Sequence, residues 1–177
     1  MRLFVALDMP WSLREMLTGL CGGLTGARWV APENFHLTLR FIGETRPHIA
    51  EEIDLALQCL RVRHLELELA GTGIFERNGR ISTLWAGVER NGRLEHLQSK
   101  IETALQRIGL QPEPRRFQPH VSLARVDGVA EPALAGWVQA HNLLRTGPVA
   151  IDSFTLFSSQ PAPDQPVYTP EVDYELV

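Results

Sequence analysis

The chain has 177 residues, and its 44% hydrophobic and 21% charged composition is that of a globular protein large enough to need no disulfides. Its formal net charge of −4 argues against broad, non-specific binding to nucleic acid driven by phosphate neutralisation. No window approaches the roughly 18 apolar residues of a membrane span, and Asp8 ends the first apolar run too early for a signal peptide. Cys21 and Cys59 lack the spacing of a zinc site or a disulfide framework. We therefore expect a reduced, cytoplasmic protein.

The first part of the chain alternates short strands with helices. Leu3–Leu7 is an apolar run that predicts a buried strand. Ser12 and Glu15 form a capping-box pattern before leucines at helical spacing, and they predict the start of a helix. A second strand is predicted over Phe35–Ile42, and Pro47 is typical of the first turn of a second helix.

The remaining elements follow in mixed order. Leu65–Leu69 alternates with glutamates and predicts a strand with one solvated face, and Asn78-Gly79 predicts a hairpin turn before a strand over Ile81–Val88. Further expected elements are helices over Leu94–Ile108 and from Pro132, and strands over Phe117–Val126, Val149–Phe157 and Val167–Leu176. About seven strands and four helices in this order predict an α+β fold with antiparallel sheets backed by helices. No Gly-rich loop joins a strand to a helix, so neither a Rossmann fingerprint nor a P-loop is present.

One four-residue pattern occurs in two of the predicted strands: histidine, apolar, hydroxyl, apolar. It reads HLTL at 36–39 and HVSL at 120–123. Side chains two apart in a strand share a face, so the histidine and the hydroxyl of each copy project together while the apolar residues face a core. A single copy would be interpreted as a structural histidine, because buried polar groups find partners. Two copies with the same spacing favour a shared site.

Two histidines and two hydroxyls around one cavity suit phosphoryl chemistry. One neutral imidazole can take a proton from an attacking water while the other, as imidazolium, gives a proton to the leaving oxygen. The hydroxyls of Thr38 and Ser122 can donate hydrogen bonds to the non-bridging phosphate oxygens. Because His36 and His120 would move the protons themselves, no metal and no cofactor is expected. The residues alone leave open which histidine is the acid.

The two motifs and their flanks resemble the 2H phosphoesterase superfamily. The stretches RLFVALDMP, ENFHLTLRFIGE (33–44) and FQPHVSLAR (117–125) are similar to the bacterial and archaeal RNA 2′,3′-cyclic phosphodiesterases, also called 2′-5′ RNA ligases. The resemblance extends over the whole chain. Its one departure is Ser122, where threonine is common in the family, and the hydroxyl is kept.

This resemblance implies a fold and an activity. The fold would be a single domain over 1–177 made of two interleaved, pseudo-symmetric lobes, each with an antiparallel sheet backed by helices, with the active-site cleft between them. The activity would be hydrolysis of RNA 2′,3′-cyclic phosphate ends, tRNA fragments among them, to 2′-phosphomonoesters by a monomer. His36 would be the proton donor and His120 the proton acceptor. The same site could run in reverse as a 2′-5′ ligase, although water at about 55 M favours hydrolysis.

Arginines near the two motifs are candidates for contacts with the substrate phosphate. Arg40 lies two residues beyond Thr38 on the predicted strand face, although a solvated arginine at a strand end would show the same pattern. Arg125 has the opposite parity from His120, so it reaches the site only if the strand bends there. Phe41, on the parity opposite to the first histidine, is expected in the core.

Two other functions stay open. The chain could act on a small cyclic nucleotide or a cyclic phosphate of an ADP-ribose derivative, or it could be a nucleotide-binding module of the same fold. Both histidines and both hydroxyls are present, which counts against the binding module. Arg115 and Arg116, just before the second motif, could contact RNA beyond the reacting end or form a solvated loop pair. Trp29 is the tryptophan most suited to stacking on a base, because it lies in a predicted loop.

Overall fold

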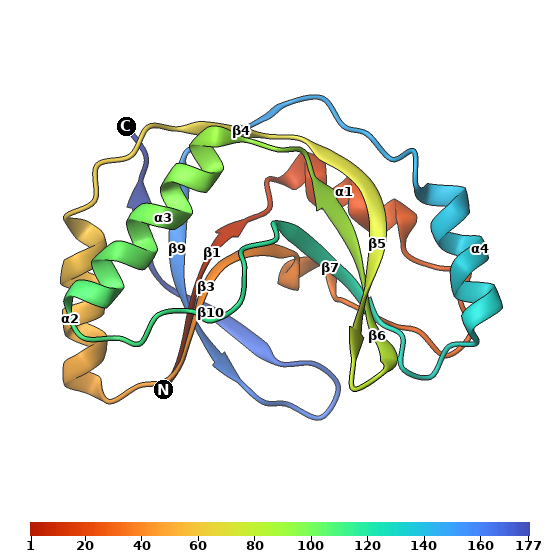
Figure 1. The fold of residues 1–177 in the computed structure, drawn as a ribbon, viewed down its shortest axis with the longest axis horizontal. Coiled ribbons are helices and arrows are strands. Elements are labelled where there is room, and N and C mark those ends of the chain that lie inside the picture. Colours follow the sequence, from red (N-terminus) through yellow and green to blue (C-terminus); the bar gives the residue numbers. More distant parts are fainter.

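A computed structural model describes all 177 residues and folds into two halves that face each other (Figure 1). The helices are α1 (Trp11–Leu20), α2 (Pro47–Gln58), α3 (Gly92–Arg107) and α4 (Glu131–His141), with a short 3-10 helix over Pro32–Asn34. The strands are β1 (Arg2–Asp8), β2 (Arg28–Trp29), β3 (His36–Glu44), β4 (Leu65–Leu67), β5 (Leu69–Arg77), β6 (Arg80–Val88), β7 (His120–Arg125), β8 (Val149–Ile151), β9 (Ser153–Gln160) and β10 (Val167–Glu175). No helix is long and apolar enough to cross a membrane.

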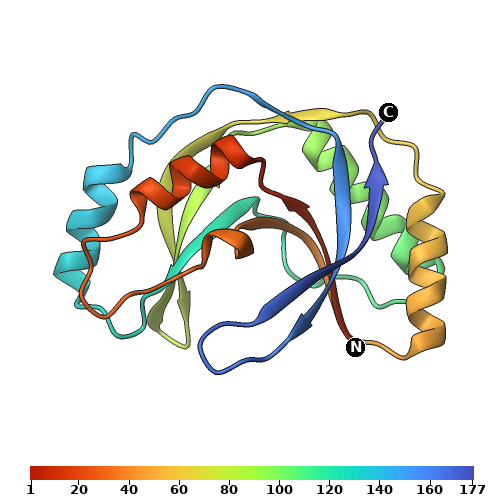
Figure 2. The same ribbon diagram turned by 180° about the vertical axis from the view of Figure 1, so that it is seen from behind.

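Eight strands form one antiparallel sheet that is divided at its centre. The order is β10-β9-β1-β3-β7-β6-β5, with β2 beside β7, while β4 and β8 form a separate two-stranded sheet. The central strands β3 and β7 pair at a single position, Leu37 with Val121. The sheet therefore splays into two halves, one covered by α2 and α3 and the other by α1 and α4 (Figures 1 and 2). This confirms the predicted two-lobed α+β fold. The sheets of the two lobes are not separate, because they are the two halves of one continuous sheet.

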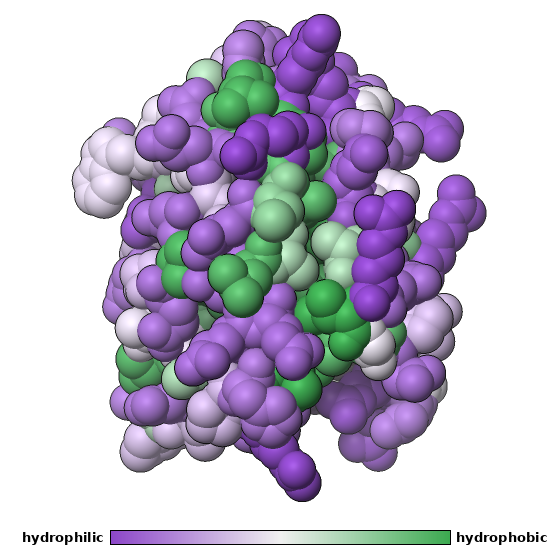
Figure 3. Space-filling view, turned by 90° about the vertical axis from the view of Figure 1, so that its left-hand side faces the viewer, coloured by the Kyte–Doolittle hydropathy of each residue, from purple (hydrophilic) through white to green (hydrophobic).

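The two halves share one hydrophobic core. Thirty-three buried residues from all of the main strands and helices form a single cluster. A second, small cluster of Phe4, Ala6 and Phe157 lies on the other face of β1 and β9, with Tyr168 against it. The end of the molecule that α2 and α3 cover is mostly hydrophilic, with hydrophobic residues gathered in a band near its middle (Figure 3).

Local sequence signals explain the start of α3 and the turn between β5 and β6. Asn91 caps α3, since its side-chain oxygen accepts hydrogen bonds from the backbone N–H groups of Arg93 and Leu94 at 3.0 and 3.3 Å. Asn78 and Gly79 both have positive φ, 53° and 75°, which confirms the predicted hairpin turn between β5 and β6. The predicted capping box is wrong: α1 starts at Trp11 directly after Pro10, and no side chain caps it.

Both motif strands contain a β-bulge immediately after the hydroxyl residue. In β3, Thr38 pairs with Ala6 and Arg40 pairs with Val5, which leaves Leu39 as the extra residue. In β7, Ser122 pairs with Trp85 and Ala124 with Leu84, which leaves Leu123 as the extra residue. The bulges reverse the side-chain alternation in both strands, so the two strands begin with the same burial pattern.

This reversal overturns two predictions about β3. Arg40, expected on the same face as the first histidine, turns to the core and is only 7% exposed. Phe41, expected in the core, is turned outward and is 51% exposed. In β7 the same reversal gives an exposed Arg125. The β7 bulge therefore supplies the bend that places Arg125 on the same face as His120.

Candidate active site

A cleft of about 720 Å³ adjoins the junction of β3 and β7. Thr38 of β3 and His120 of β7 line it, and its walls come from β3, β5, β6, α3 and the loop between α3 and β7. His36 and Ser122 are not among the lining residues, and they belong to the β3–β7 junction itself. The cleft thus begins at the two motifs and extends away from them toward the loop that precedes β7.

The single β3–β7 pair determines how the four motif side chains meet. Leu37 and Val121 are fully buried, so the residues on either side of them project to the opposite face of the sheet. Extending the antiparallel register by one residue each way places His36 across from Ser122 and Thr38 across from His120. Each histidine therefore lies across from the hydroxyl of the other motif. The structure brings the four predicted residues together.

Both histidines are held in the same tautomer by the same kind of contact. The Nδ1 of His36 lies 2.7 Å from the carbonyl oxygen of Asn34, and the Nδ1 of His120 lies 2.7 Å from that of Gln118. A carbonyl only accepts hydrogen bonds, so each Nδ1 carries a hydrogen and donates it. Each Nε2 is then the ring nitrogen that carries no hydrogen and can accept a proton.

Aromatic rings surround both imidazoles. His36 lies against Phe4 and Tyr168, with ring centroids 5.1 and 5.2 Å apart, and His120 lies against Phe75 at 4.8 Å in an edge-to-face arrangement. Burial lowers the pKa of both histidines and outweighs the carbonyl hydrogen bonds, which raise it. Each imidazole is therefore easier to deprotonate than a free histidine.

Asp8 makes the two histidines unequal. It pairs with His36 across β1 and β3, and its carboxylate accepts hydrogen bonds from the Arg14 guanidinium at 2.7 Å and from the Met9 N–H at 3.0 Å. Its negative charge raises the pKa of His36 against the larger effect of burial. No carboxylate has such an effect on His120.

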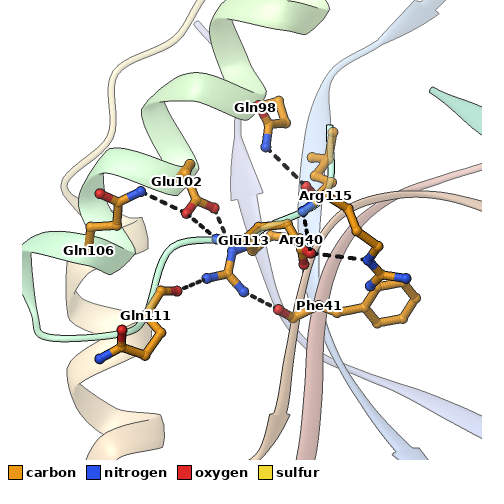
Figure 4. Close-up of polar contacts among 9 residues, drawn as sticks. Arg40, Phe41, Gln98, Glu102, Gln106, Gln111, Glu113 and Arg115 are labelled. Atoms are coloured by element: carbon orange, nitrogen blue, oxygen red, sulfur yellow. Dashed lines mark hydrogen bonds and ion pairs between the residues drawn. The ribbon is translucent and has the colours of Figure 1, made fainter. Parts of the chain in front are cut away.

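Arg40 supports the site from the core side (Figure 4). Its Nε donates to the Glu102 carboxylate of α3 at 2.5 Å, and its two terminal nitrogens donate to the backbone oxygens of Phe41 and Gln111. Burial raises the pKa of Glu102, but hydrogen bonds from Gln106, the Glu113 N–H and Arg40 outweigh it and lower the pKa below its ordinary value. The guanidinium is fully engaged, so Arg40 ties β3 to α3 and the following loop. It is not available for the phosphate contact that the sequence suggested.

Arg125 is the arginine that remains available. Its exposed side chain makes no hydrogen bond or ion pair within the protein, unlike that of Arg28 beside it, which pairs with Asp127 at 3.1 Å. Trp29 is not available for base stacking, because it is half-buried in β2 and packs against Trp137 with ring centroids 5.8 Å apart.

Sequence reasoning missed three residues around the histidines: Asp8, Phe75 and Tyr168. They lie far from the motifs in the chain and reach them only through strand pairing. The alternation along β1 could have indicated only that Asp8 shares a strand face with Phe4 and Ala6. No group of three or more histidine, cysteine or carboxylate side chains gathers to hold a metal ion.

A cleft that begins at a pair of histidine–hydroxyl motifs, one from each half of an α+β sheet, is the arrangement expected of a two-histidine phosphoesterase. A family model described as "2'-5' RNA ligase superfamily" matches residues 25–161. The chain belongs to this superfamily, which confirms the family predicted from the sequence.

Named relatives and solved structures agree with this family assignment. The chain is 37% identical over 141 residues to an RNA 2′,3′-cyclic phosphodiesterase of Aeropyrum pernix, covering 78% of this chain and 80% of the relative. It superposes on the protein TT0787 of Thermus thermophilus with a TM-score of 0.82 at 25% identity, covering 99% and 98% of the two chains. Escherichia coli LigT complexed with 3′-AMP gives a TM-score of 0.79 at 28% identity, covering 99% and 97%. The relatives are named as phosphodiesterases, which confirms the prediction of an enzyme.

We expect Arg40→Met to destabilise the fold. The substitution leaves the Glu102 carboxylate, which is only 17% exposed, without its cationic partner, and removing one partner of a buried ion pair costs about 3–5 kcal/mol. The measurement is the free energy of unfolding from urea denaturation. Arg28→Met, which breaks the exposed pair with Asp127, is the control and should cost less than about 1 kcal/mol. Equal stability of the two variants would contradict a structural role for Arg40.

Proposed function

We propose that this chain hydrolyses RNA 2′,3′-cyclic phosphate ends to 2′-phosphomonoesters by metal-independent acid–base catalysis. The observation that carries the proposal is the Leu37–Val121 pair, which places two histidines and two hydroxyls on one face at the end of a cleft. The names of the relatives support the substrate, since several are RNA 2′,3′-cyclic phosphodiesterases.

His120 acts as the proton acceptor and His36 as the proton donor. The Nε2 of His120 takes a proton from water while the water oxygen forms a bond to phosphorus. The bond between phosphorus and the 3′-oxygen breaks, and the 3′-oxygen takes a proton from the Nε2 of His36. Asp8 supports this assignment, because a carboxylate across from His36 favours its imidazolium form.

The phosphate oxygens are held by neutral and charged donors. Thr38 and Ser122 present hydroxyls on the face of the histidines, and Arg125 has a free guanidinium that the β7 bulge turns to that face. Hydrogen bonds from such groups stabilise the charge of the transition state. Microscopic reversibility allows the same site to join a 5′-hydroxyl to a cyclic phosphate.

The charge of the cleft favours RNA over a small nucleotide. Arg77, Arg115 and Arg116 line it beyond the histidines together with Glu76 and Glu113, so these five side chains carry one net positive charge in a chain whose net charge is −4. A small cyclic nucleotide fills only the end at the motifs, whereas an RNA chain places further phosphates along these arginines. Ends of tRNA fragments are suitable substrates for a cytoplasmic, monomeric enzyme of this kind.

Replacing either histidine should nearly abolish turnover. His36→Ala and His120→Ala each remove a positioned acid or base, and we expect kcat to fall roughly 10²–10⁴-fold. The assay follows hydrolysis of an oligoribonucleotide that ends in a 2′,3′-cyclic phosphate and identifies the 2′-phosphate product. His96→Ala, which changes an exposed histidine on α3, is the control. Near-wild-type turnover by either folded single variant would refute the two-histidine mechanism.

The pH dependence of kcat/KM should be bell-shaped with its maximum below pH 6.5. The maximum lies midway between the two apparent pKa values, and burial lowers both from the ordinary histidine value of 6.5. Asp8→Asn removes the charge that raises the pKa of His36, so the alkaline limb should move to lower pH while the acid limb stays. Asp152→Asn, at an exposed aspartate, is the control for the lost charge. Movement of the acid limb instead would reverse the roles of the histidines.

Chelation should leave activity unchanged. The side chains that move protons are both histidines, and no cluster of three or more ligand side chains stands near them or elsewhere. We expect dialysis against EDTA to leave kcat/KM within experimental error of the untreated enzyme. Loss of turnover on dialysis, followed by recovery with added divalent metal, would assign the reaction to a metal site.

A further inference from the structure

The side-chain amide of Gln165 binds the loop between β9 and β10 to the segment that precedes the first motif. Its Oε1 accepts a hydrogen bond from the Ala31 N–H at 2.8 Å, and its Nε2 donates to the Trp29 carbonyl at 2.7 Å. Gln165 is the one residue of the loop over Pro161–Pro166 that is not exposed. Because one amide satisfies both a backbone N–H and a backbone carbonyl, it takes the place of a neighbouring strand along this segment.

The other edge of this segment is held by β7. Trp29 pairs with Ala124, and the Val30 N–H donates at 2.8 Å to the carbonyl of Leu123, the extra residue of the β7 bulge. The segment is therefore bonded on one edge to the second motif strand and on the other edge to Gln165. Since β7 and the β9–β10 loop belong to different halves of the sheet, the segment links the two halves just before β3 begins.

The segment leads directly to the carbonyl that orients His36. Asn34 ends the short 3-10 helix, and its backbone oxygen lies 2.7 Å from the Nδ1 of His36. The Asn34 N–H donates to the Ala31 carbonyl at 2.8 Å, and its side chain donates to the Pro166 carbonyl at 3.1 Å. The β9–β10 loop therefore holds this short helix at both ends, through Gln165 at its start and through Pro166 at its end.

The Asn34 carbonyl fixes both the plane and the tautomer of the His36 ring. It accepts only from an N–H, so it keeps a hydrogen on Nδ1 and leaves Nε2 as the nitrogen whose proton moves. Asp8 and His120 act on this ring through their charge, and Tyr168 packs edge-on against it. None of these three contacts determines which ring nitrogen carries the hydrogen. A ring without the carbonyl is free to turn, and a misplacement of about 1 Å in a reacting group can cost about 10²-fold in rate.

We propose that Gln165 is a positioning residue of the active site, which holds the Asn34 carbonyl in place and thereby orients the imidazole of His36. This inference rests on the proposed function, in which His36 is the proton donor, and it names the residue that aligns that donor. His120 has the same kind of contact with the carbonyl of Gln118, which Gln165 does not touch. The second histidine is therefore an internal reference for the effect of Gln165 on the first.

The direct test is nitrogen NMR of the imidazole rings in the free enzyme, and it needs no turnover. At a pH well above the histidine pKa, the chemical shifts of the two ring nitrogens show which one carries the hydrogen. In Gln165→Ala we expect His36 to lose its single Nδ1–H tautomer and to populate the Nε2–H form, while the signals of His120 stay unchanged. Gln160→Ala, at an exposed glutamine that ends β9 in the same hairpin, is the matched control and should leave both rings unchanged. An unchanged His36 tautomer in Gln165→Ala would overturn the assignment.

The kinetic test uses an oligoribonucleotide that ends in a 2′,3′-cyclic phosphate. Gln165→Ala should lower kcat by roughly 10- to 100-fold with a smaller change in KM, because the donor is misaligned while the groups that bind the phosphate remain. The alkaline limb of the pH profile should move to lower pH and the acid limb should stay, because the hydrogen bond to the Asn34 carbonyl raises the pKa of His36. Asn34→Ala, which keeps the backbone carbonyl and removes only the bond to Pro166, should act in the same direction with a smaller effect.

The two tests distinguish this role from the proposed function. If the wild-type enzyme does not hydrolyse the oligonucleotide, the proposed function is wrong, and the tautomer of His36 still decides whether Gln165 positions the ring. If it does hydrolyse it and Gln165→Ala leaves kcat, the alkaline limb and the His36 tautomer unchanged, the function stands and the positioning role is wrong.

Discussion

The contact between Leu37 and Val121 is the constraint on which the site depends. These two residues are fully buried, and burying an aliphatic side chain of this size contributes about 1.5–3 kcal/mol. Holding them in the core forces their neighbours to the other face of the sheet. Because this is the only position at which β3 and β7 pair, the two halves are free to splay on either side of it. A longer ladder would close the space that the cleft occupies.

The two matching bulges in β3 and β7 determine which side chains beyond the motifs are exposed in each half. Each bulge leaves the fourth residue of its motif unpaired, and the side chains beyond it exchange faces. The residues at corresponding positions are unlike: a buried Arg40 corresponds to a buried Ala124, and an exposed Phe41 corresponds to an exposed Arg125. One half therefore offers an aromatic ring to the cleft face and the other offers a cation.

The sequence predicted the motifs and the fold class, but not what the bulges do. Strict alternation correctly placed the histidine and hydroxyl of each motif on one face, because both lie before the bulge. Beyond it, alternation put Arg40 on the wrong face and Phe41 in the core. A bulge depends on how the neighbouring strand pairs, and the residues next to Leu39 include no glycine or proline from which it could be predicted. The ion pair between Arg40 and Glu102 joins residues far apart in the chain, so only the fold reveals it.

The near-symmetry of the site raises a chemical problem. Two histidines with the same pKa would be protonated to the same extent, so neither would be favoured as the acid or as the base. The surroundings are nearly matched, with a carbonyl two residues upstream and aromatic rings beside each imidazole. Asp8 breaks the match, since its charge acts on His36 and has no counterpart at His120. The positive charge of Arg14 partly offsets that of the Asp8 carboxylate, so the rise that Asp8 causes in the pKa of His36 is moderated. A moderated bias suits the proton donor that we propose His36 to be, because a strongly stabilised imidazolium would be a poor acid.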